Sequence, residues 1–98
     1  MRTYFVFLLP LLLFFTSNSF AAGGENVELL ASSCAACHGT RGHSVGGLPS
    51  LAGMDRLYFI EQMTQFTNGE RPSKVMKQLA SGYSEDEIEL LAEFFAKQ

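Results

Sequence analysis

Cys34-Ala35-Ala36-Cys37-His38 is the stretch of this chain that decides its fold. Two cysteines separated by two residues and followed at once by a histidine form the attachment pattern of c-type haem. At this spacing each thiol can form a thioether bond to a vinyl group of the haem edge, and the adjacent imidazole is carried under the ring as an iron ligand. The motif therefore predicts one covalent haem c, with His38 as the proximal ligand.

The cysteine pair has three other conceivable roles. A thioredoxin-like redox pair would need a β-α-β pattern, whereas the residues before the motif indicate a helix and a glycine-rich loop follows it. A zinc site draws on three or four protein ligands, and the cysteines and histidines of this chain, Cys34, Cys37, His38 and His43, are crowded into one short segment. A disulfide here would close a very small loop and add little stability. Haem attachment fits best.

Residues 1–21 have the pattern of a secretory signal peptide. A positive charge at Arg2 is followed by an uncharged apolar run over 4–15 and by small residues before a cleavage site after Ala21. The apolar run is shorter than the roughly 20 residues that span a bilayer, which argues against a membrane anchor. We therefore expect export to the periplasm, no stable membrane insertion after cleavage, and a mature haem domain over 22–98.

The composition of this mature part is that of one small domain. Once Arg2 is removed, six basic residues face ten acidic ones, a net charge of −4. A negative balance argues against a nucleic-acid partner, because nucleic acid favours a basic surface. A core of this size supplies only roughly 3–5 kcal/mol unaided. A buried haem would therefore serve as a large apolar centre for the fold.

Apolar spacing and capping residues predict short helices on both sides of a loop. Residues with helical spacing run into the motif, namely Val27, Leu30, Ala31 and Cys34. Glycines and a proline between 39 and 53 rule out a regular helix there. Asp55 is expected to cap a helix over about 56–68, and a further short helix over about 74–81 ends at Gly82.

The last helix is the best specified element. Ser84 and Glu87 form a capping box, and Tyr83 and Ile88 flank it as a hydrophobic staple. The apolar stripe of this helix consists of Ile88, Leu91, Ala92 and Phe95. No stretch alternates apolar and polar residues over the length of a strand, so the predicted fold class is all-α.

The second axial position of the iron decides what the haem does. A methionine there gives six-coordinate iron of raised potential, suited to electron transfer, whereas an open position suits ligand binding or catalysis. Met63 lies on an apolar stripe and is expected in the core. His43 follows His38 too closely in the chain to reach the other face of the ring. Met54, a loop methionine before the Asp55 cap, could be a ligand, although the chain between it and His38 is short for this role. Met76 is far enough along the chain and is the expected ligand.

A ligating imidazole normally donates its second N–H to a carbonyl or carboxylate, which fixes the ring. Pro49, at the turn out of the glycine-rich loop, offers a carbonyl on a stiff segment of chain. From the sequence alone an ordinary turn proline is an equal alternative.

These residues resemble the class I cytochrome c family. The run Cys-Ala-Ala-Cys-His-Gly-Thr-Arg-Gly-His-Ser at 34–44 and the Pro-Ser-Leu-Ala-Gly stretch at 49–53 are similar to the small haem domains of cytochrome c4 and cytochrome c-553. The segments 54–63 and 75–84 resemble the cytochrome subunit of flavocytochrome c sulfide dehydrogenase. The resemblance covers nearly all of 25–98.

The resemblance implies a class I cytochrome c fold in which Cys34 and Cys37 carry the thioethers. It implies His38 as the proximal and Met76 as the distal iron ligand, with the Pro49 carbonyl holding the histidine. It also implies a single-electron carrier that is not itself an enzyme, working with redox partner proteins such as a flavoprotein subunit of sulfide dehydrogenase. Such proteins can carry two haem domains, whereas this chain has one haem motif, so a single-haem subunit and a free periplasmic carrier of c-553 type both stay open. A ligand-binding or sensor haem with a labile sixth ligand is a further alternative.

Overall fold

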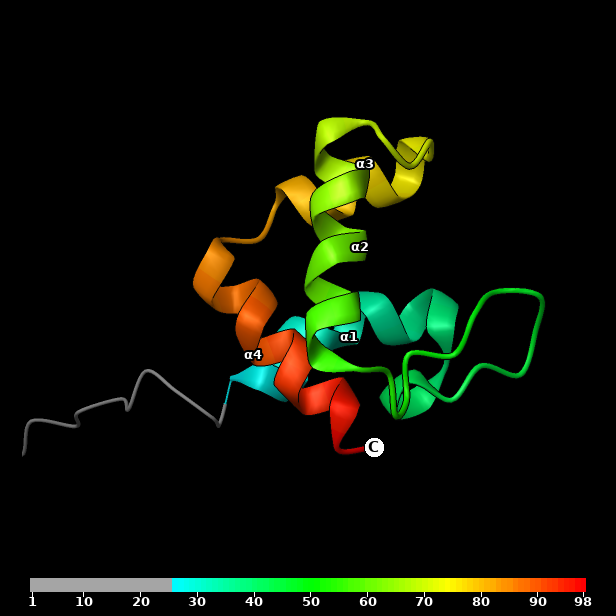
Figure 1. Ribbon diagram of the computed structural model, residues 1–98. Coiled ribbons are helices and arrows are strands. Elements are labelled where there is room, and N and C mark those ends of the chain that lie inside the picture. The colour runs from blue at the N-terminus through cyan, green and yellow to red at the C-terminus, as the bar shows by residue number, and fades with distance from the viewer. Residues whose placement is uncertain (1–25) are drawn as a thin grey trace, which may run out of the picture.

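The computed structural model describes residues 26–98, and within that range the chain is helical without strands. The helices are α1 (Val27–His38), α2 (Arg56–Asn68), α3 (Lys74–Ser81) and α4 (Glu85–Ala96), and a short 3-10 turn, η1 (Thr40–Gly42), follows α1 (Figure 1). The all-α fold class and the predicted helices over 56–68 and 74–81 are confirmed. The predicted signal peptide, residues 1–21, lies outside the described residues.

None of the helices between residues 26 and 98 has the length and apolar character needed to cross a membrane.

Side-chain caps fix where three of the helices begin. Asp55, Ser73 and Ser84 precede α2, α3 and α4, and each side chain accepts a hydrogen bond from an amide three residues further on. Such a cap satisfies a backbone donor that the helix itself leaves unpaired. Glu87 also accepts from the Ser84 amide at 2.9 Å, so the predicted capping box is present.

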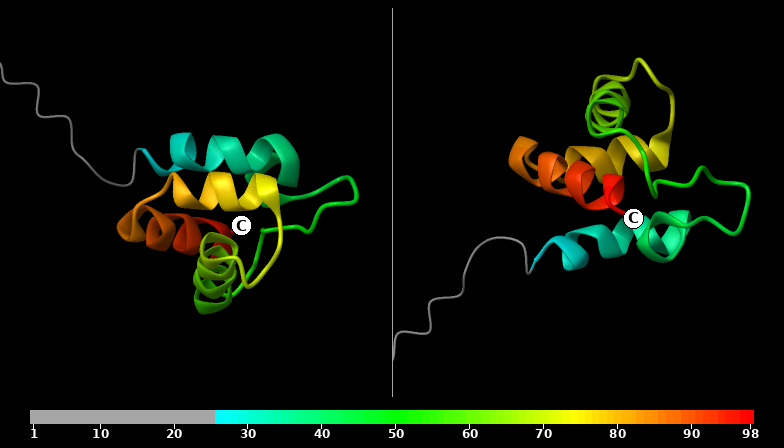
Figure 2. Two further views of the ribbon diagram at one scale, coloured as in Figure 1. Left: turned by 90° about the horizontal axis from the view of Figure 1, so that it is seen from above. Right: turned by 60° about the horizontal axis from the view of Figure 1, so that its bottom comes forward.

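The core lies where α1, α2 and α4 meet. α2 packs against α3 and α4, and α1 packs against α4 (Figure 2). The buried apolar side chains of the described chain are Ala31, Cys34, Leu51, Phe59, Met63, Ala80, Leu91, Ala92 and Phe95. Phe59 of α2 stacks on Phe95 of α4, with 5.7 Å between the ring centroids. The predicted stripe of the last helix is therefore the centre of the core, with Ile88 half-buried beside it.

Gly42 fastens the loop that follows α1. Its carbonyl accepts hydrogen bonds from the Leu51 and Ala52 amides at 2.8 and 3.1 Å, which closes residues 43–50 into a loop. Its φ is +81°, and a Cβ built on it would lie 2.8 Å from Cδ1 of Phe95. Glycine is required here both by the left-handed backbone and by the close approach of the core. The loop expected over 39–53 contains the short 3-10 turn η1 near its start. The glycines and proline predicted the absence of a regular helix there but not this turn.

We expect Gly42→Ala to lower the free energy of unfolding by about 1–3 kcal/mol, since the added methyl overpacks against Phe95. Gly47→Ala is the matched control, because a Cβ there meets nothing within 4 Å and its φ is not left-handed. Denaturant unfolding of the two haem-loaded variants beside the wild type measures the difference. Equal stability of the two variants would contradict the role given to Gly42.

Candidate functional site

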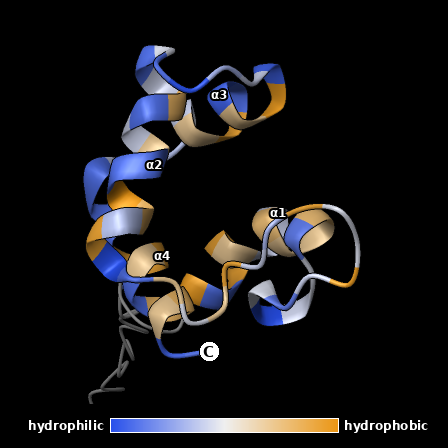
Figure 3. Ribbon diagram, turned by 45° about the vertical axis from the view of Figure 1, so that its right-hand side comes forward, coloured by the Kyte–Doolittle hydropathy of each residue, from blue (hydrophilic) through white to orange (hydrophobic). Residues whose placement is uncertain are grey.

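A cavity of 620 Å³ opens between α1, the loop after it, α2 and α3. α1 and α3 lie on opposite sides of the opening and α2 forms the wall between them (Figure 3). Most of its lining side chains are apolar, such as Leu51, Phe59, Phe66 and Leu79. The motif residues that the sequence singled out, Cys34, Cys37 and His38, all reach this cavity, together with Pro49.

The two cysteines stand on one wall, on the same helix. Cys34 is 9% exposed and Cys37 is exposed, because their positions on α1 face the core and the cavity mouth respectively. No disulfide joins them. Burial raises the pKa of the Cys34 thiol, and hydrogen bonds with Tyr83 and Ser33 act in the opposite direction. Both thiols are therefore available on a single edge of the cavity.

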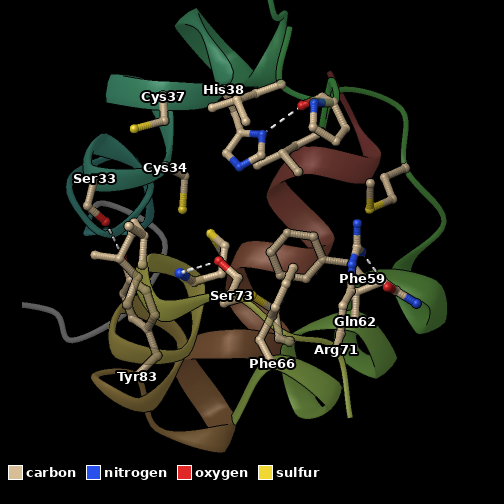
Figure 4. A pocket seen from close by; sticks show the side chains of 18 of the residues that line it. Ser33, Cys34, Cys37, His38, Phe59, Gln62, Phe66, Arg71, Ser73 and Tyr83 are labelled. Atoms are coloured by element: carbon tan, nitrogen blue, oxygen red, sulfur yellow. Dashed lines mark hydrogen bonds between the residues drawn. The ribbon is translucent and has the colours of Figure 1, made fainter. Parts of the chain in front are cut away.

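His38 is the last residue of α1, and its ring points into the cavity (Figure 4). Its Nδ1 lies 2.6 Å from the carbonyl oxygen of Pro49. A carbonyl only accepts, so Nδ1 carries the proton and donates it. Nε2 then keeps its lone pair, which is the tautomer that a metal-binding histidine needs. The hydrogen bond from His38 to the Pro49 carbonyl is therefore present. From the sequence, an ordinary turn proline was an equal alternative.

Three methionines line the cavity, so the lining alone does not select a second ligand. Met63 is 4% exposed and belongs to the core, as expected, whereas Met54 and Met76 are half-buried. Met76 lies in the first turn of α3, where its amide donates to the Ser73 hydroxyl at 3.1 Å. It therefore sits on the wall that faces α1 (Figure 3). His43 is exposed and is not part of the lining.

Tyr83 has a role that the sequence did not indicate. It precedes the cap of α4, but its hydroxyl donates to the carbonyl of Leu30 in α1 at 2.8 Å and also hydrogen-bonds the Ser33 hydroxyl. Partial burial raises its pKa. Its aromatic ring also lines the cavity. The sequence offers no local signal for contacts between residues 53 and 50 positions apart.

Tyr83→Phe removes both hydrogen bonds and keeps the ring, so we expect the free energy of unfolding to fall by about 0.5–1.5 kcal/mol. Tyr58→Phe serves as the control, because Tyr58 is 49% exposed and its hydroxyl makes no hydrogen bond within residues 26–98. Thermal unfolding of the haem-loaded proteins compares them. A Tyr83 variant as stable as the Tyr58 variant would show that the link to α1 contributes nothing.

The residues present fit a haem. A mainly apolar cavity of 620 Å³ has paired thiols on one wall, an imidazole in the metal-binding tautomer, and thioether side chains on the other walls. The chain belongs to the cytochrome c family, whose model matches residues 25–97. Its cofactor is covalent haem c with its iron, and it is an electron carrier rather than an enzyme. The predicted family, class I fold and cofactor are thereby confirmed.

Three relatives show which cytochromes the chain is similar to. It is 46% identical over 68 residues to the cytochrome subunit of sulfide dehydrogenase of Chlorobaculum tepidum, covering 69% of this chain and 62% of that protein. It is 35% identical over 75 residues to the thiosulfate dehydrogenase electron acceptor of Stutzerimonas stutzeri, covering 74% and 34%. It is 34% identical over 85 residues to cytochrome c4 of Pseudomonas aeruginosa, covering 85% and 42%. The chain thus spans between about a third and three fifths of the length of these relatives.

Proposed function

We propose that this chain is an exported monohaem cytochrome that serves as the cytochrome subunit of a flavoprotein sulfide dehydrogenase. The observation that carries the proposal is the 46% identity to the Chlorobaculum tepidum subunit. Export to the periplasm is supported by the signal-like pattern of residues 1–21. The attachment motif supports it as well, because covalent haem attachment in bacteria takes place outside the cytoplasm. In this role the cytochrome receives, one at a time, the electrons that the flavoprotein removes from sulfide.

The walls of the cavity support the proposed ligand set, with Met76 chosen over the other lining methionines by its distance along the chain from His38. Cys34 and Cys37 of α1 form the thioethers, His38 binds iron through Nε2, and Met76 of α3 supplies the sixth ligand. Axial ligands must approach a planar ring from opposite faces, and α1 and α3 face each other across the cavity. The carbonyl of Pro49 keeps the imidazole in the right tautomer and orientation.

When bound, the haem supplies an iron that gains and loses a single electron. The protein's task is to keep the surroundings of the iron the same in both oxidation states. Pro49 holds the imidazole, and the Ser73 cap holds the backbone of Met76. Phe59 and Met63 are buried in the wall between these ligands and exclude water, which favours the less charged ferrous state.

Met76→Ala should abolish the weak near-infrared sulfur-to-iron band of the oxidised protein, lower its potential and open the ferrous haem to CO. Met54→Ala is the matched control, a half-buried methionine of the same cavity, and should leave band and potential in place. Met63→Ala should keep the band but lose about 2–5 kcal/mol of stability, as expected for a buried methionine. Loss of the band in the Met54 variant instead would move the sixth ligand to that residue.

A free periplasmic carrier is the second candidate function. It is supported by two relatives described as thiosulfate dehydrogenase electron acceptors, at 35% and 36% identity. A free carrier meets its partners briefly, whereas a subunit stays bound to one. The two functions therefore differ in whether a stable complex exists.

The test mixes the haem-loaded cytochrome with a purified flavoprotein subunit of a sulfide dehydrogenase. We expect the two to elute together in size-exclusion chromatography, and the haem to be reduced when sulfide is added without oxygen only if the flavoprotein is present. A soluble cytochrome c of low sequence identity to this chain serves as the control for non-specific reduction. Reduction without co-elution would favour the free carrier, and neither reduction nor co-elution would reject the sulfide dehydrogenase assignment.

A further inference from the structure

Arg71 is the one side chain of permanent charge among the residues that line the cavity. It lies in the segment between α2 and α3, on the wall that α2 forms. Within residues 26–98 the ion pair formed is that of Lys97 with Glu93 in α4, so Arg71 has no acidic partner there. An arginine turned toward a largely apolar cavity, with no carboxylate of the described chain in an ion pair with it, is suited to an acidic group of a ligand.

Three contacts hold this arginine in one place. The guanidinium lies over the ring of Phe66, 4.7 Å from its centroid, and donates a hydrogen bond to Oε1 of Gln62. The Arg71 amide donates to the Gln65 carbonyl at 3.0 Å, which anchors the backbone to the end of α2. The planar guanidinium keeps further N–H donors beyond the one given to Gln62, in the fork geometry that matches a carboxylate.

The position of Arg71 relative to the cysteines gives a second, independent indication. Cys34 and Cys37 lie at one side of the cavity and Arg71 and Gln62 at the opposite side (Figure 4). In a haem the vinyl groups that form thioethers lie on one edge of the porphyrin, and the two propionate carboxylates lie on the edge across from them. Attachment at α1 therefore directs the carboxylates toward the side on which Arg71 stands.

We propose that Arg71 binds a haem propionate and that Gln62 positions Arg71 for this contact. The proposal rests on the attachment through Cys34 and Cys37 and is independent of which protein delivers the electrons. A cation beside the carboxylate lowers the propionate pKa. Reduction adds a negative charge to the haem, so the same cation also stabilises the ferrous state and raises the potential.

The decisive variants are Arg71→Gln and Arg56→Gln in the isolated haem-loaded cytochrome. Arg56 begins α2, is exposed, and is absent from the cavity lining. Arg56→Gln therefore removes the same charge at a position away from the site. The measurement is the midpoint potential at an electrode as a function of pH. In Arg71→Gln we expect a lower potential at neutral pH, and the onset of pH dependence should move up by about 1–3 pH units. Arg56→Gln should keep the wild-type onset.

Arg71→Lys, which keeps the charge, should restore most of the wild-type profile. An Arg71→Gln profile that matches Arg56→Gln overturns the proposal. Should Arg71→Gln fail to mature, infrared titration of the haem carboxyl groups in the wild-type protein decides. One propionate pKa below the usual carboxyl range of about 4 supports the pairing, and two ordinary values overturn it.

The two proposals fail in distinguishable ways. An absence of sulfide-dependent reduction rejects the partner and leaves the electrode profile unaffected. Haem that separates from the polypeptide on a denaturing gel shows that the thioethers are absent. The vinyl edge is then not fixed at α1, and the placement of a propionate at Arg71 is overturned.

Discussion

The hydrogen bond between Nδ1 of His38 and the carbonyl of Pro49 is the contact on which the site depends, and it is supported from the core outward. Pro49 lies in a loop that Gly42 closes, by accepting from the two amides at the far end of that loop. Gly42 in turn lies against Phe95, which is fully buried in α4. The state of a single imidazole nitrogen therefore follows from how the last helix packs. A change at Phe95 would reach the iron through the loop, without touching the cavity.

The core and the cavity share walls. Phe59 and Met63 of α2 belong to the buried cluster and also line the cavity, so the same side chains serve folding and exclude water from the iron. A chain of this size buries too little apolar surface for a large margin of stability. A covalently held haem adds apolar contacts to α1, α2 and α3 at once. Stability and redox behaviour are therefore expected to change together when these shared residues are replaced.

The helices were predictable because their signals are local. Asp55 and the Ser84–Glu87 pair act on amides within one turn, and the stripe of the last helix repeats every few residues. The motif at 34–38 likewise indicates covalent haem attachment from neighbouring residues alone. What the sequence could not rank depended on how distant elements meet. Three methionines line one cavity, so the sequence could not show which of them lies nearest the iron. The path of the loop after α1 determines whether the Pro49 carbonyl lies within hydrogen-bond distance of His38. The contacts of Tyr83 with α1 gave no local signal, because Leu30 and Ser33 become its neighbours only when the helices pack. Arg71 has its partners on the preceding helix α2, but no motif marks it as part of the cavity.

The packing of α1 against α4 also determines when the Cys34 thiol can react. In the folded chain Cys34 shares the core with Leu91, Ala92 and Phe95. Before α4 packs on α1, the thiol stays in water, its pKa is not raised by burial, and a larger fraction is the reactive thiolate. A thioether formed at that stage is afterwards enclosed by the fold. The folded structure then protects a bond that the unfolded chain was better able to make.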